Sequence, residues 1–174
     1  MFIELLIPGL LLITYSRKPF YSRRNTYSYL KELIIMNILP KTGIDNIKLG
    51  ISRNDAQSKL GKPASKEQQG EEEIWEYESG IELSFQAEDE YRLSSITVFA
   101  ESALLDSKPI IGITEEELES IFPSFQMDED FKQDGKSFYA DDLQIMAWVF
   151  EGEVFNIIIF PEYDEESELP IWPK

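Results

Sequence analysis

The sequence contains no cysteine and no histidine among its 174 residues. Without cysteine, disulfides, thiolate metal sites and cysteine nucleophiles are excluded. Without histidine as well, Ser-His and Cys-His catalysis and zinc sites of the usual nitrogen and sulfur type cannot be built. Carboxylates, lysine, tyrosine and hydroxyl groups are what remains for chemistry. We therefore expect a protein that is not an enzyme, with no catalytic residues, no metal and no cofactor.

Basic side chains are scarce. The chain has 16 Lys and Arg against 33 Asp and Glu, a formal net charge of −17. Nucleic-acid binding needs a basic surface to meet the phosphates, so we expect no nucleic-acid partner. A basic protein is the partner that this charge favours, although an acidic surface also keeps a cytoplasmic protein soluble whatever it binds. The expected location is the cytoplasm.

A long hydrophobic run is lacking too. The most apolar stretch, "MFIELLIPGLLLITY" at residues 1–15, contains Glu4 and Pro8 and is shorter than the about 20 residues of a membrane-spanning helix. Basic residues follow this stretch, whereas they precede the apolar core of a signal peptide. Lys31-Glu32 can be encoded by AAGGAG, which resembles a bacterial ribosome-binding sequence, upstream of Met36. We expect no membrane partner and interpret residues 1–35 as a leader, upstream sequence that a misplaced start adds before a domain at 36–174.

One phrase occurs twice, as "GISRNDAQSKLGKP" at residues 50–63 and "GITEEELESIFP" at residues 112–123. In each copy a hydroxyl residue, Ser52 or Thr114, stands where a helix N-cap is expected. An acidic residue follows three positions later, which is the pattern of a capping box. A proline soon after each phrase predicts that both helices are short.

Strand-like segments follow each predicted helix. They are "IWEYE", "GIELSFQA" and "YRLSSITVF" in the first copy, and "SFYA", "LQIMAWVFEG" and "EVFNIIIF" in the second. The sequence therefore predicts an α+β fold of two tandem helix-plus-three-strand units, at about 44–102 and 109–163. The units would share one antiparallel sheet with the short helices packed on one face, followed by an acidic C-terminal tail.

The two units differ in their expected sheet faces. Residues 81–86 alternate between apolar and polar, which is typical of a sheet with one solvated face. Residues 143–150 are apolar on both faces, with Met146 and Trp148 at positions that are polar in the first unit. Two interpretations stay open. The strand is covered on both sides, with "ELPIWPK" at the C-terminus folded over it, or it presents an exposed aromatic patch to a partner.

A family resemblance rests on three short motifs. They are Gly50-x-Ser52, Leu60-Gly61-x-Pro63 and Trp75-x-Tyr77. Over about residues 42–163 the chain resembles the SmpA/OmlA domain and the related beta-lactamase inhibitor protein. That resemblance implies a non-catalytic module whose sheet binds another protein. The lipoproteins of the family need a lipidated cysteine, which is absent. In its general character, a small acidic domain, the chain is also similar to the immunity proteins of bacterial polymorphic toxins.

The segment "DEDFKQDGKSFYADD" contains part of a calcium-loop pattern, starting at Asp130. Its third position is Lys132, which opposes a cation, so we expect an Asp-Gly turn and no metal.

These observations lead to one hypothesis and one alternative. The hypothesis is an immunity protein or inhibitor that neutralises a basic bacterial toxin. The alternative is a structural or assembly module of the SmpA type. Aromatic anchors with an acidic rim are typical of protein interfaces. The residues expected to bind the partner are Trp75, Tyr77, Met146, Trp148, Glu88, Asp89 and Glu90.

Overall fold

The computed structural model of the chain describes residues 2–5, 13–16 and 35–174, with side chains from Ile35 onward. Strands β1 (Phe2–Leu5) and β2 (Ile13–Ser16) pair as an antiparallel hairpin. Most of the interpreted leader, residues 1–35, lies outside the described residues. In the part of the chain that is described, no helix has the length and apolar character needed to cross a membrane.

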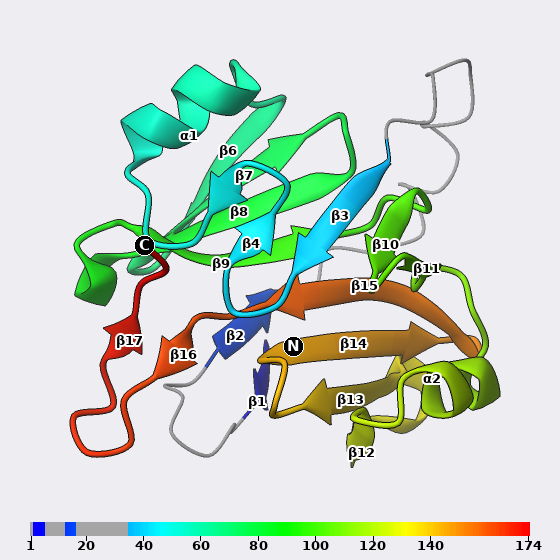
Figure 1. The fold of residues 1–174 in the computed structure, drawn as a ribbon. Coiled ribbons are helices and arrows are strands. Elements are labelled where there is room, and N and C mark those ends of the chain that lie inside the picture. The colour runs from blue at the N-terminus through cyan, green and yellow to red at the C-terminus, as the bar shows by residue number, and fades with distance from the viewer. Residues whose placement is uncertain (1, 6–12, 17–34) are drawn as a thin grey trace.

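An eight-stranded antiparallel sheet dominates the fold (Figure 1). Its order is β12-β13-β14-β15-β9-β8-β7-β6, so four consecutive strands lie on each side of the central β15–β9 pair. The strands are β6 (Ser65–Gln69), β7 (Glu72–Tyr77), β8 (Ile81–Gln86), β9 (Leu93–Val98), β12 (Gln126–Asp130), β13 (Lys136–Ala140), β14 (Ile145–Phe150) and β15 (Glu153–Ile159). Helix α1 (Arg53–Leu60) precedes the first four strands and α2 (Glu115–Ile121) precedes the second four.

A smaller sheet of five short strands lies over the middle of the large one (Figure 1). Its order is β11-β10-β3-β4-β5, and β3 runs parallel to β10. The strands are β3 (Met36–Leu39), β4 (Gly43–Ile44), β5 (Ile47–Lys48), β10 (Ala103–Leu105) and β11 (Lys108–Pro109). Strands β16 (Glu162–Tyr163) and β17 (Pro170–Ile171) form a C-terminal hairpin, and short 3-10 turns occupy Ala87–Asp89 and Lys132–Asp134.

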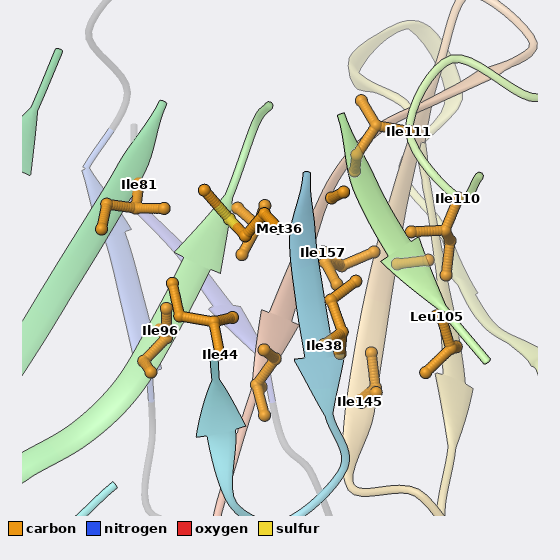
Figure 2. Close-up of a cluster of buried hydrophobic side chains, with 14 of the residues drawn as sticks. Met36, Ile38, Ile44, Ile81, Ile96, Leu105, Ile110, Ile111, Ile145 and Ile157 are labelled. Atoms are coloured by element: carbon orange, nitrogen blue, oxygen red, sulfur yellow. The ribbon is translucent and has the colours of Figure 1, made fainter. Parts of the chain in front are cut away.

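The main core lies between these two sheets. In Figure 2, Ile38 and Ile44 of the small sheet project among Ile96 and Ile157 of the large sheet. All four side chains are buried, and each contributes about 1.5–3 kcal/mol to folding through removal from water. We call the face of the large sheet that meets the small sheet the near face, and the opposite one the far face.

The predicted α+β class with helix-plus-three-strand units is wrong. Within the part of the chain that the structure describes, strands account for 47% of the residues and helices for 15%, so the fold is mostly β. Each helix precedes four strands rather than three. The prediction missed β6 and β12, because they are edge strands whose exposed polar residues give no alternation. The helices do not form the layer that covers the sheet either. They lie toward its ends, contributing one fully buried side chain each, Ala56 and Leu118, while the small sheet covers the centre (Figure 1).

The repeated phrase has the same surroundings in both copies. The Gly50 amide donates to the Leu93 carbonyl at the start of β9, and the Leu93 amide donates to the Ile51 carbonyl. Gly112 and Ile113 exchange the equivalent two hydrogen bonds with Val154 in β15. Each phrase is thus hydrogen-bonded to an inner strand of the large sheet just before its helix begins.

Both expected N-caps are present, but the two caps differ. Thr114 Oγ1 accepts the Glu117 amide at 3.2 Å, and Glu117 Oε2 accepts the Thr114 amide at 2.9 Å, which completes a capping box. Ser52 Oγ accepts the Asp55 amide at 3.1 Å. The Asp55 carboxylate accepts the Ser52 hydroxyl at 2.6 Å instead of the Ser52 amide. Aspartate is one methylene shorter than glutamate, so α1 has only half of the box.

Candidate functional site

The aromatic residues expected at one surface lie on two different faces. Trp75 and Tyr77 belong to the near-face core and are 2% and 7% exposed. The Trp75 ring packs on Phe85 with centroids 4.9 Å apart, and its Nε1 donates to Glu73 Oε1 at 2.7 Å. The expected extension of a binding surface through Trp75 and Tyr77 is therefore not present. Trp75 and Tyr77 lie on the opposite face of the sheet from Met146 and Trp148, because successive side chains of a strand alternate between the two faces.

Met146 and Trp148 point to the far face, as the alternation of β14 predicts. The expectation that both are exposed is wrong for Met146, which is 1% exposed, and Trp148 is half-buried. Phe131 and Tyr163, which lie outside β14, pack against Met146 and its neighbours and account for this burial. The far face of strands β13–β15 therefore carries a small apolar cluster of its own. Tyr163 and Phe131 cover this cluster, whereas Trp172 of the C-terminal segment packs on the main core.

We call this group the far-face cluster. Its members are Met146, Ile158, Phe160, Phe131, Tyr139, Trp148 and Tyr163. The Phe131 and Trp148 rings stack with centroids 5.2 Å apart and an interplanar angle of 29°. Gly135 allows the chain to turn over Trp148, because its φ is +112° and an added Cβ would lie 2.9 Å from Trp148 Nε1.

That turn is the expected Asp-Gly turn. Lys132 Nζ donates to Asp130 Oδ2 at 3.1 Å, so the residue that breaks the calcium-loop pattern pairs with its first carboxylate. Across the residues that the structure describes, no group of three or more acidic side chains is arranged to hold a metal ion.

Carboxylates surround the two tyrosines of the far-face cluster. Burial raises the pKa of Tyr163, and the negative charges of Asp89 and Glu88 raise it further. Burial, with the charges of Asp141 and Asp128, raises the pKa of Tyr139 to about 12. Both hydroxyls thus stay protonated as hydrogen-bond donors, and the Tyr139 hydroxyl donates to Gln144 Oε1 at 2.9 Å.

The acidic turn expected to bind a partner is only partly beside this cluster. Glu88 and Asp89 are close enough for their charges to act on Tyr163. Glu90 lies 3.9 Å from Arg92 and is highly exposed. The structure therefore brings Met146 and Trp148 together with Glu88 and Asp89, through Tyr163. Sequence reasoning missed both tyrosines, although Tyr139 alternates with buried Phe138 and so was identifiable as a far-face residue.

Asn156 is a polar side chain beside the cluster. It stands opposite Trp148 in the β14–β15 pairing, is 2% exposed, and its Oδ1 has no hydrogen-bond partner. An unsatisfied buried acceptor costs about 1–3 kcal/mol, so this position is not optimised for stability. The signal in the sequence was a single asparagine within the apolar run "VFNIIIF".

The far face of strands β6–β8 is acidic rather than aromatic. The strand registers place Glu67, Glu72, Glu76 and Glu82 on it, together with Ser84, and Thr97 follows on the neighbouring β9. The whole far face therefore changes from carboxylates at β6–β8 to aromatic rings at β13–β15. Sequence reasoning noted the polar positions of β8 but did not align them with those of β6 and β7.

Comparisons with known proteins assign no family and no function to the chain. No protein-family model and no curated protein matches the chain. Among solved structures, a DUF4309 family protein from Bacillus subtilis is similar at 12% identity and a TM-score of 0.49, over 68% of this chain and 84% of that one. An extracellular protein containing a SCP domain from Bacillus anthracis is similar at 12% identity and a TM-score of 0.44. That alignment spans 66% of this chain and 44% of the other. At TM-scores below 0.5, neither similarity assigns the chain to a fold family or a function.

Proposed function

We propose that the protein is a non-catalytic binding module for a basic protein, of the kind that serves as an immunity protein or inhibitor of a bacterial toxin. The observation that carries this proposal is the ring of carboxylates around the tyrosines of the far-face cluster. Asp89 and Glu88 act on Tyr163, and Asp141 and Asp128 act on Tyr139.

Charge and aromatic side chains have separate roles in this function. Carboxylates at the rim accelerate the encounter with a basic surface, and the net charge of −17 extends this attraction over the molecule. Aromatic side chains with hydroxyl groups anchor a complex, because they combine a large apolar area with a polar tip.

The test is binding of the full chain to the proteins encoded by the genes immediately beside its own, among which we expect a basic partner. Surface plasmon resonance supplies the association and dissociation rates, and the partner's own activity reports inhibition. We expect tight binding whose association rate falls as salt is added, because salt screens the rim charges.

Asp89→Asn probes the rim and Glu101→Gln is its control. Both remove one negative charge, but Glu101 is an exposed residue of the β9–β10 connection, outside the far-face cluster. We expect Asp89→Asn to slow association severalfold, whereas Glu101→Gln leaves it nearly unchanged. Equal effects of the two variants on the association rate would show that only the general attraction between opposite charges acts, and that Asp89 has no specific role. Absence of binding by the wild type would contradict the proposal itself.

A further inference from the structure

Two consecutive glutamates in β7 have opposite surroundings. Glu73 points to the near face, where Arg53 and the Trp75 indole donate to it, and the Lys66 ammonium lies over the Trp75 ring. Burial by itself raises the pKa of Glu73, but these hydrogen bonds and the charges of Arg53 and Lys66 outweigh it and lower the pKa. The fold thus provides cations for this carboxylate.

Glu72 points to the far face and has no such cation. Its neighbours across the sheet are Gln69 in β6 and Gln86 in β8, and the hydroxyl of Ser84 donates to its Oε1. Among the described residues no lysine or arginine forms a hydrogen bond or ion pair with Glu72. By register, the ionisable side chains that follow on this face, Glu67 and Glu76, are acidic as well.

Burial of this carboxylate therefore carries a cost that the chain does not offset. Burial raises the pKa of Glu72, and the Ser84 hydrogen bond opposes this increase only in part. A cation brought close to this carboxylate favours its charged form, and close charge pairs across protein interfaces contribute measurable coupling energies. The second carboxylate oxygen, Oε2, accepts no hydrogen bond from the described residues and is the atom that a cation would meet.

We propose that Glu72 is the counter-ion for a basic side chain of the partner protein, so that the docking surface crosses the far face from the far-face cluster to β7. This inference rests on the proposed function for the identity of the partner. A carboxylate of this kind requires hydrogen-bond donors that carry positive charge, which arginine and lysine side chains supply.

The first experiment needs no natural partner. The carboxyl carbons of Glu72 and Glu116 are followed by NMR through a pH titration of the full chain, with and without acetylated octa-arginine amide. Glu116 is the internal control, since it is exposed on α2. We expect the peptide to lower the pKa of Glu72 by about one unit, as a cation within a few ångströms does, and that of Glu116 by much less. Equal shifts at both residues would overturn the proposal.

Glu72→Gln and Glu116→Gln then separate binding from folding. Glutamine keeps an acceptor for Ser84 and removes the charge of this half-buried side chain, so Glu72→Gln is expected to raise the urea midpoint of the free chain. The same substitution is expected to weaken octa-arginine binding about tenfold, mainly through faster dissociation, because a desolvated pair is lost. Glu116→Gln, which removes one exposed charge, is expected to change both properties little. A Glu72→Gln variant that binds like Glu116→Gln would refute the assignment.

The outcome is distinguishable from failure of the proposed function. If the protein encoded beside the gene binds the chain and Glu72→Gln leaves its dissociation rate unchanged, the inference fails and the function stands. If octa-arginine lowers the pKa of Glu72 as expected but the protein encoded beside the gene does not bind, the proposed function fails and the cation site stands.

Discussion

Replacement of the two N-cap hydroxyls tests how the repeated phrase starts its helices. Thr114→Ala removes the acceptor of the Glu117 amide, held at 3.2 Å, and leaves the Glu117 carboxylate on the Thr114 amide. Ser52→Ala removes the acceptor of the Asp55 amide, held at 3.1 Å, together with the hydroxyl that donates to Asp55. Each variant therefore leaves one helix amide without its side-chain acceptor, while the strand bridge next to the cap remains.

The expected loss is about 1 kcal/mol for each variant, the usual cost of removing an N-cap hydroxyl. For a domain of this size, such a loss lowers Tm by about 2–4 °C. The two caps are on separate helices and share no partner, so the double variant is expected to lose about 2 kcal/mol, within about 0.5 kcal/mol of additivity.

Urea denaturation followed by far-UV circular dichroism measures these losses, with Ser120→Ala as the control. Ser120 is an exposed hydroxyl in the same helix as the Thr114 cap and lies outside its capping interactions. Neutral effects at both caps would refute the role of the repeated phrase as a helix start. A double variant far from additive would show instead that the two helices unfold through a shared step.

Three further predictions concern stability. Asn156→Leu is expected to raise the free energy of unfolding by about 1–2 kcal/mol in urea, because it removes an unsatisfied buried amide, and a decrease would show that Oδ1 has a partner. The lowered pKa of Glu73 favours the folded state above the unfolded pKa near 4.5, and this contribution disappears as pH falls through the folded pKa. Glu73→Gln should therefore flatten the acid side of the stability profile, and an unchanged slope would contradict the ion-pair assignment. Residues 36–174 expressed alone should match the full chain in thermal stability, because every strand of the two larger sheets lies between Met36 and Ile159. A loss above about 2 kcal/mol would show that the leader belongs to the fold.

The sequence was most informative where a local signal coincides with a local structure. The hydroxyl caps at Ser52 and Thr114 start helices, and the apolar face of residues 81–86 lies in the main core. The alternation in residues 143–150 left two interpretations open and did not reveal that Met146 is buried. Edge strands β6 and β12 were missed because exposed edges need no apolar face, so "SKEQQ" and "QMDED" show no strand period. The five-stranded sheet was missed because its strands have two to four residues, too few for any periodicity.

The candidate site depended on contacts that no spacing reveals. Whether Met146 is exposed is decided by Phe131 and Tyr163, which come from a turn before β13 and a segment after β15. The difference between Glu72 and Glu73 is decided by Arg53, which reaches the second glutamate from α1. Coverage by residues that are distant in the sequence depends on tertiary packing. The sequence therefore predicted side chains of the site but not their exposure.

The central pairing of the large sheet has a consequence for how the molecule assembles. Three residue pairs join β9 to β15, at Ile96, Thr97 and Val98, whereas β14 and β15 share six. The small sheet lies over this narrow junction, and its β3 and β10 come from segments more than sixty residues apart (Figure 2). Each half of the large sheet can form from neighbouring strands, but closing the junction requires contacts that are distant along the chain and therefore slow. The junction is therefore expected to be the last part of the protein to form, and its loss separates the two halves of the large sheet. We expect the amides of β9 and β15 to exchange with solvent only when the whole molecule opens.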